Sequence, residues 1–258
     1  IESYIKNKIK KMKMHNNYME NLKYLSPNIN IDLVSKFENR IKEIAIPKHS
    51  SKKWFDVRRS RVTEFMAELL LEKEQNCIFY DEADKRINLD ILDLDKHAQG
   101  IDVTGINNKD GEFKFVICEV KASKEENIPC SMANTLLEDV KKAYNSVERI
   151  NKDIAQYIKW LIKDGNPSDE ILINIINFLM LLICESSSKE VVLKNVIFFP
   201  FLIRNNPKIS KDMNLDDFVH FSKEDFVGTN LKGIIWSFNE DIDSFCINIY
   251  DEVLKDEK

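Results

Sequence analysis

The chain has few of the residues that build phosphate loops or zinc sites. Only 6 of its 258 residues are glycine and no Gly-rich phosphate loop is found, so we expect no nucleotide bound by this chain. Its five cysteines form no C-x-x-C pair and its four histidines are scattered, which argues against a structural zinc site. An odd, dispersed set of cysteines is typical of reduced thiols, so we expect a cytoplasmic protein.

The sequence has no apolar run long enough to span a bilayer, and we expect no signal peptide. The most apolar helix-like stretch, residues 171–184, contains Asn174 and Asn177 and is too short and too polar to cross a bilayer. We therefore expect no membrane association. This stretch and residues 191–203 could serve the core or an interface, and we favour the core. The chain begins at Ile1 rather than Met, so we expect that residues precede it.

The charge balance is acidic, with a net charge of -5. A protein that binds DNA alone is usually basic, because Lys and Arg release counterions from phosphates. The sequence therefore favours a local basic groove or a partner that supplies the DNA. The lysines of residues 6–13 are more simply a solvated helix face than a phosphate-contacting arm. The candidate nucleic-acid-binding residues are Arg58, Arg59, Arg61 and Lys141.

Hydrophobic periodicity divides the chain into an α/β pattern. Residues 1–50 are predicted to form a helical N-terminal extension, broken at Ser26-Pro27-Asn28, and residues 51–258 to form one domain. In that domain we expect helices at 54–72 (amphipathic), 133–163 and 171–184, the last capped by Ser168, and a final helix capped by Asn239. Strands are predicted at 77–80, 101–106, 113–121, 191–203 and 231–238. The order predicts a mixed sheet flanked by helices.

The residues with the clearest chemical meaning lie on a predicted hairpin. Asp102 is on its first arm, an Asp-Gly turn lies within residues 107–111, and Glu119-Val120-Lys121 ends the apolar second arm. Side chains alternate along a strand, so Glu119 and Lys121 project from one face. Mg²⁺ takes oxygen ligands and keeps several waters, so Asp102, Glu119 and the Val120 carbonyl could hold it.

Two further residues complete this hypothesis. Lys121 is predicted to orient a water or to offset phosphate charge, and Glu64, on the helix at 54–72, to assist as a further metal ligand. The E-x-K pattern alone is weak, since Glu112-Phe113-Lys114 repeats it beside the turn. The simpler alternative is a surface ion pair at an exposed strand end. We favour the metal site because an acid at the end of an apolar run needs a partner.

These residues resemble the signature of the PD-(D/E)XK nuclease superfamily. The matching positions are Glu64 on its helix, Asp102 in Gly-Ile-Asp-Val, and Glu119-Val-Lys121 in Ile-Cys-Glu-Val-Lys-Ala-Ser. The resemblance covers about residues 58–150, and Gly-Ile stands where a proline often precedes the acid. It implies a restriction-endonuclease-like core that hydrolyses DNA phosphodiester bonds with Mg²⁺ or Mn²⁺.

Within that superfamily, two blocks resemble the HamA nuclease subunits of Hachiman-type anti-phage defence systems. One is the Arg-rich helix with Thr63-Glu64, and the other runs from His97-Ala-Gln-Gly-Ile-Asp102 to Glu-Val-Lys-Ala-Ser. The resemblance implies an antiviral nuclease that works beside a helicase partner. His97 could be a proton shuttle or a phosphate contact, but we favour a plain loop histidine. The alternatives are a non-catalytic interaction subunit that keeps the fold, and a nuclease that acts on RNA.

Overall fold

The computed structural model describes residues 1–13, 52–80, 102–164, 169–185, 188–205 and 217–255. Contacts divide the chain into two compact units. The first unit comprises residues 1–62, 85–98 and 243–258, and the second comprises residues 63–84 and 99–242. The boundary predicted between residues 50 and 51 falls outside the described residues.

The described residues of the first unit form three helical segments. They are α1 (Glu2–Lys13), the beginning of α4 (Lys52–Gln75) as far as Val62, and α10 (Ile242–Lys255) from Asp243. α1 buries Ile5 and Ile9, four residues apart on one face, as an amphipathic helix does. Lys6 of α1 pairs with Glu252 of α10. The predicted N-terminal helix is thus confirmed for α1, while the break at residues 26–28 lies outside the described part.

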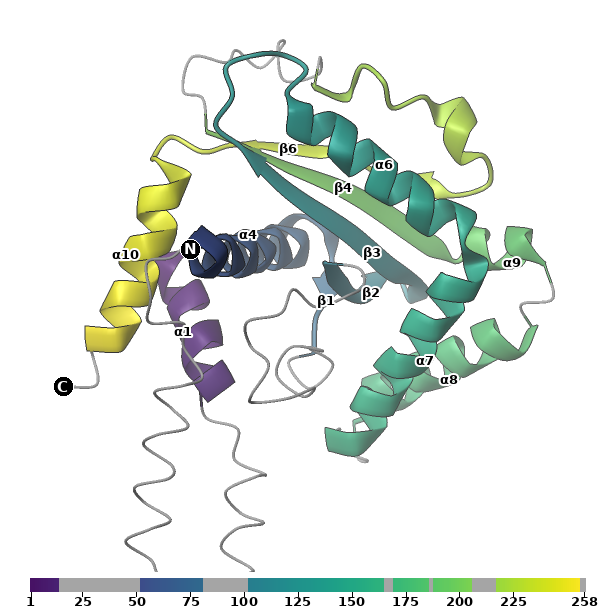
Figure 1. Ribbon diagram of the computed structural model, residues 1–258. Helices are drawn as coiled ribbons and strands as arrows, with labels where there is room; N and C mark the ends of the chain where they lie inside the picture. The colour runs from purple at the N-terminus through teal and green to yellow at the C-terminus, as the bar shows by residue number, and fades with distance from the viewer. Residues whose placement is uncertain (14–51, 81–101, 165–168, 186–187, 206–216, 256–258) are drawn as a thin grey trace, which may run out of the picture. The chain divides into compact units, whose positions relative to one another are not determined.

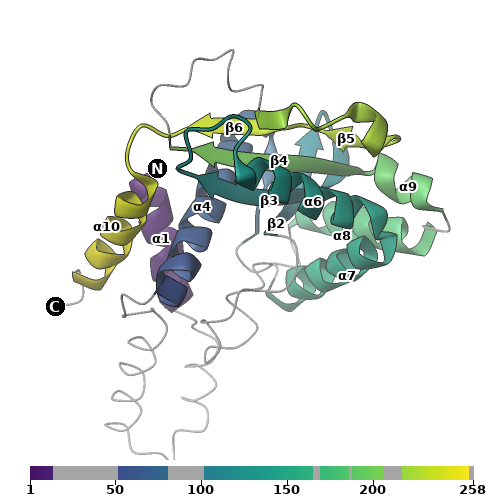
Figure 2. The same ribbon diagram turned by 45° about the horizontal axis from the view of Figure 1, so that its top comes forward.

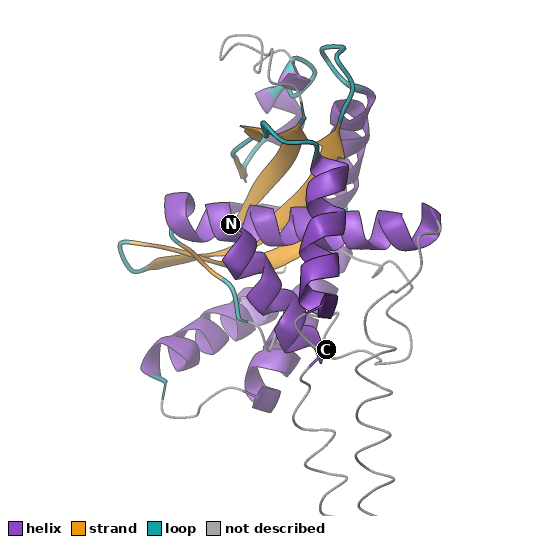
Figure 3. Cartoon of the chain, turned by 90° about the vertical axis from the view of Figure 1, so that its left-hand side faces the viewer, coloured by secondary structure: helices purple, strands orange, loops and turns teal. Residues whose placement is uncertain are grey.

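The second unit is built on a six-stranded mixed sheet (Figures 1 and 3). Its strands are β1 (Cys77–Ile78), β2 (Val103–Lys109), β3 (Glu112–Ser123), β4 (Val196–Arg204), β5 (Asn230–Leu231) and β6 (Ile234–Ser237). β1, β2 and β3 are antiparallel neighbours, β4 runs parallel to β3, and β5 and β6 both run parallel to β4. This arrangement confirms the predicted mixed sheet flanked by helices.

The β2–β3 hairpin turns at Asp110-Gly111. Both residues have positive φ, 55° and 86°, as a two-residue hairpin turn of type I′ requires. The strands pair from Lys109↔Glu112 to Val103↔Cys118. The hairpin is confirmed, but β2 continues to Lys109, so the predicted turn at 107–111 is too long and Asp102 lies just before the strand.

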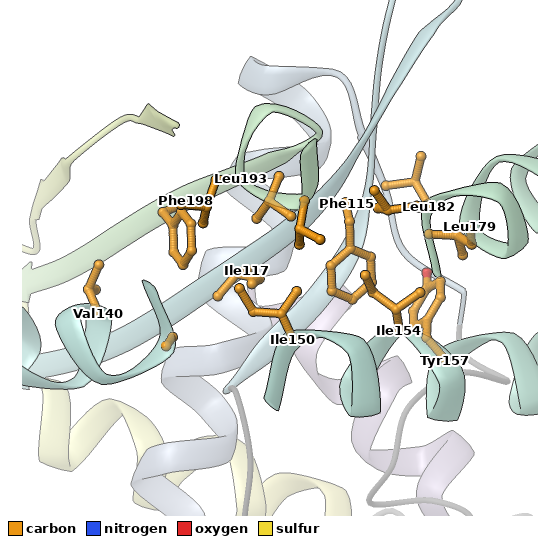
Figure 4. Packing of buried hydrophobic residues seen from close by; sticks show 14 of the residues in the cluster. Phe115, Ile117, Val140, Ile150, Ile154, Tyr157, Leu179, Leu182, Leu193 and Phe198 are labelled. Carbon is orange, nitrogen blue, oxygen red and sulfur yellow. The ribbon is translucent and has the colours of Figure 1, made fainter. Parts of the chain in front are cut away.

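Helices α6 (Ser131–Asn145), α7 (Val147–Asp164), α8 (Glu170–Glu185) and α9 (Lys189–Lys194) follow the hairpin. They lie together beside the sheet (Figure 2). Their apolar side chains pack with Phe115 and Ile117 of β3 and Phe198 of β4 into one core cluster (Figure 4). The core cluster therefore covers this face of β3 as far as Ile117. The next residues along the strand on the same face are Glu119 and Lys121.

Several predicted helix boundaries are wrong. The single helix at 133–163 is two helices, because Ser146 ends α6 and its Oγ accepts the Arg149 N–H of α7 at 3.3 Å. α8 is confirmed as a helix, and Asp169 accepts the Leu172 N–H at its start at 3.1 Å, whereas Ser168 is not described. α10 begins at Ile242, so Asn239 lies too early to cap it.

The structure also differs from the predictions in the length of two strands and in the burial of two helices. Residues 191–194 are helical in α9, so the predicted strand at 191–203 starts only at Val196. The strand at 231–238 is interrupted at Lys232-Gly233 between β5 and β6. α8 is not wholly buried, since Ile171, Ile173, Met180 and Leu181 are each 44–57% exposed. α4 lacks a solvated polar face around Glu64 and Glu68, which are both buried.

Candidate active site

The candidate site lies where β2 and β3 stop pairing. Their last pair is Val103↔Cys118, and one residue further along each strand lie Asp102 and Glu119. The Asp102 carboxylate accepts the Val120 N–H at 2.8 Å, in place of the backbone partner that β2 no longer supplies. In a strand, the N–H and C=O of one residue point to the same edge. The Val120 carbonyl is therefore on the same edge of β3 as Asp102.

Glu119 is held in an unusual environment for a carboxylate. It follows the core residues Phe115 and Ile117 on one face of β3, and it is only 4% exposed. Burial, reinforced by the negative charge of Asp102, raises the pKa of Glu119 to about 8. Its Oε1 atom is buried, and no residue in the described part of the chain donates a hydrogen bond to it. Such a carboxylate is stabilised when a cation joins it.

Lys121 lies on the same face as Glu119 and contacts two acids. Its Nζ is 3.0 Å from Asp139 of α6 and 3.7 Å from Asp102. Burial alone would lower the pKa of Lys121, but Asp102 and Asp139 outweigh it and raise that pKa above its ordinary value. Lys121 therefore remains a cation at neutral pH, able to donate hydrogen bonds but not to take a proton.

Two residues of this cluster were missed from the sequence. Asp139 of α6 pairs with Lys121 and, at 2.9 Å, with Lys142. Arg149 of α7 has a guanidinium nitrogen 3.7 Å from Glu119 Oε1. Both come from the helices that follow β3. In the sequence, the one sign that Asp139 and Arg149 could belong to the site was that both are charged residues on a helix predicted to cover the sheet.

The structure brings together four of the predicted site residues: Asp102, Glu119, Val120 and Lys121. Glu64 is buried on α4, but the four charged groups that act most strongly on Glu119 do not include it. Burial raises the pKa of the Cys118 thiol, and Glu68 adds to that effect. Cys118 points to the face of β3 opposite Glu119. None of these observations places Glu64 next to Glu119. The role of Glu64 as a further metal ligand stays a prediction.

The predicted nucleic-acid contacts have partners within the protein. Arg58 lies over the Tyr250 ring, 5.1 Å from its centroid, and Arg59 is 3.3 Å from Asp243. Arg61 is 7% exposed. Lys141 Nζ is 2.8 Å from Asp225. For these four side chains a phosphate-binding role stays a prediction, and His97 lies outside the described residues.

The two E-x-K copies occupy different surroundings. Glu112 is exposed at the turn end of β3, next to Gly111, whereas Glu119 is buried beyond the last β2–β3 pair. The two glutamates therefore differ in burial, as the apolar run before Glu119 predicted. This difference also makes Glu112 and Lys114 matched controls for the candidate site.

The site suits a hard divalent cation better than zinc. Across the described ranges there is no group of three or more His, Cys, Asp and Glu residues arranged to hold a metal. Mg²⁺, however, binds through one or two carboxylates and keeps waters or substrate oxygens as its other ligands. Asp102, the buried Glu119 oxygen and the Val120 carbonyl could supply oxygen ligands of that type.

No protein-family model, curated protein or solved structure that was compared with the chain matches it. Among the helices that the structure describes, none has the length and apolar content needed to cross a membrane.

Proposed function

We propose that this protein is a metal-dependent nuclease that hydrolyses DNA phosphodiester bonds at the end of the β2–β3 hairpin. The observation that carries the proposal is the buried Glu119, which feels the charge of Asp102 and has an oxygen without a hydrogen-bond donor among the described residues. Burial and the negative charge of Asp102 raise the pKa of Glu119, and binding of a cation or a proton stabilises a carboxylate in this position. A site with that property is costly to keep without a function.

The protein's residues have separable roles in this reaction. Asp102, Glu119 and the Val120 carbonyl would hold Mg²⁺ or Mn²⁺, and the ion would polarise a phosphoryl oxygen and make a nearby water more acidic. The Val120 N–H fixes the Asp102 carboxylate in place. Lys121, kept protonated by Asp102 and Asp139, orients the attacking water or offsets negative charge on the phosphate. Glu64 is proposed to assist as a further ligand.

The topology and charge are compatible with the wider proposal. An antiparallel β1–β2–β3 meander followed by helices and a parallel β4 suits the restriction-endonuclease-like core that the resemblance implies. A net charge of -5 suits a nuclease that receives DNA from a helicase partner. The setting in anti-phage defence rests on the HamA-like sequence blocks alone.

The test is cleavage of supercoiled plasmid, single-stranded DNA and RNA with Mg²⁺, Mn²⁺ or EDTA. The protein is assayed alone and with the product of the neighbouring gene. Glu119→Gln and Lys121→Met are compared with Glu112→Gln and Lys114→Met, which change the same residue types on the same strand. We expect metal-dependent cutting that the first pair abolishes and the second pair keeps. Equal activity in all four variants, or no cutting by correctly folded protein, would refute the proposed site.

A further inference from the structure

Arg149 occupies a position that is unusual for a cation. It lies in the first turn of α7, where its N–H donates to Ser146 Oγ at 3.3 Å. The N-terminus of a helix carries partial positive charge and favours anions, so a cation there is disfavoured unless an anion lies nearby. One anion that lies near Arg149 is Glu119.

The contact between these two residues is loose. A guanidinium nitrogen is 3.7 Å from Glu119 Oε1, which is longer than a hydrogen bond, and that oxygen accepts no hydrogen bond from any residue that the structure describes. The Arg149 side chain is 34% exposed, whereas the Glu119 side chain is 4% exposed. The Arg149 side chain therefore lies between the buried Glu119 carboxylate and solvent. A large ligand could reach Arg149 from the solvent side.

The other cation of the site is held more firmly. Lys121 contacts both Asp139 and Asp102. A divalent cation at Glu119 would compete with Arg149 for the same carboxylate, because both are positive and Oε1 is the atom that Arg149 approaches. Arg149 is the group that such a cation would release.

We propose that Arg149 binds a phosphate oxygen of the nucleic-acid substrate once a divalent cation occupies Glu119. This inference rests on the function proposed above. The planar guanidinium donates two parallel hydrogen bonds to phosphate, a geometry that an ammonium cannot provide. Arg149 thus weakens the binding of the metal alone and strengthens the binding of the substrate.

These opposite effects separate a substrate role from a structural one. Mg²⁺ affinity is measured by calorimetry without nucleic acid, and duplex oligonucleotide binding by fluorescence anisotropy with Mg²⁺. The oligonucleotide assay uses Lys121→Met proteins, which prevents cleavage. Arg149→Met should bind Mg²⁺ about two- to fivefold more tightly, as expected for removing a partly exposed charge. It should bind the oligonucleotide about tenfold more weakly, as expected for losing a charge-assisted hydrogen bond.

Lys152→Met is the matched control, because it removes an exposed cation from the same helix, one whose partner is Glu148. It should change neither affinity appreciably. Unchanged or weaker Mg²⁺ binding by Arg149→Met, or unchanged oligonucleotide binding, would overturn this inference while leaving the metal site intact. If the wild-type protein and Glu119→Gln show the same Mg²⁺ response, the proposed function fails as well, which is a different signature.

Discussion

Replacing Glu119 with glutamine should make the metal-free protein more stable at alkaline pH. In the unfolded chain this carboxyl ionises near its ordinary pKa of 4.5, whereas in the folded protein burial and Asp102 raise the pKa to about 8. The folded state therefore holds the proton more tightly. Stability falls as pH rises from about 4.5 to about 8, because folding then requires a buried charge. Glutamine has nearly the same shape and never ionises.

The size of this effect follows from the difference in pKa. Each pKa unit corresponds to about 1.4 kcal/mol, so a rise from 4.5 to about 8 amounts to roughly 5 kcal/mol at pH 9. Relaxation around Glu119 and nearby cations will reduce the measured value, and we expect Glu119→Gln to gain at least about 2 kcal/mol at pH 9. Near pH 5, where Glu119 is protonated in the folded state, the two proteins should be nearly equal.

The assay is urea unfolding of both proteins in EDTA at pH 5, 7 and 9. Glu112→Gln, which changes an exposed glutamate at the other end of β3, should show no comparable trend. Saturating Mg²⁺ should then reverse the order at pH 9, because a ligand that binds only the folded state stabilises it and glutamine cannot bind the ion well. A stability difference that stays constant between pH 5 and pH 9 would refute the reasoning about Glu119.

Three further outcomes are expected. Binding of Mg²⁺ must displace the Glu119 proton, so its apparent affinity, measured by calorimetry, should rise about tenfold per pH unit below pH 8 and level off above it; a flat profile would contradict this. Arg204 and Asp217 form a fully buried ion pair at 3.1 Å, so Arg204→Met should cost about 3–5 kcal/mol of unfolding free energy in urea titrations, and adding Asp217→Leu should restore part of it. Gly111 has a φ of 86°, so Gly111→Ala should lower stability by about 1 kcal/mol in the same titrations, whereas an equal midpoint would show that the turn can change shape.

The hairpin could be predicted because its signals are local. Asp110-Gly111 is a turn pair in which both residues adopt positive φ, and the apolar run of β3 flanks it. Register and parity then follow from the turn, so the sequence sufficed to place Asp102, Glu119 and Lys121 near one another. The same reasoning explains why Glu112 is not equivalent to Glu119, since only one of them lies beyond the last strand pair.

The predicted boundaries of helices and strands are wrong where hydrophobic periodicity does not distinguish a helix from a strand or one helix from two. A short apolar run such as Val191-Val192-Leu193 suits a buried helix as well as a strand, and Ser188 decides for the helix by accepting the Val191 N–H. Ser146 similarly divides a continuous helical pattern by capping α7. Both helix starts have a capping hydrogen bond to a serine side chain, which the apolar pattern does not predict.

Asp139 and Arg149 could not be assigned to the site for a different reason. They come from α6 and α7, and their distance from β3 depends on how the core cluster packs these helices against the sheet. Sequence spacing along a helix gives the face of a residue but not the strand position that it reaches. Tertiary packing therefore supplied the part of the site that the motif alone lacked.

The two-residue turn fixes the register of the β2–β3 hairpin, and this register sets the positions of Asp102 and Glu119 relative to each other. With Lys109 paired to Glu112 and Val103 to Cys118, the two arms have equal length between the turn and the acids. A single inserted residue in one arm would move its acid by about 3.4 Å and turn its side chain to the other face. Matched insertions, one residue in each arm near the tip, would lengthen the hairpin without disturbing the acids. The tip of this hairpin can therefore vary in length during evolution only in paired steps.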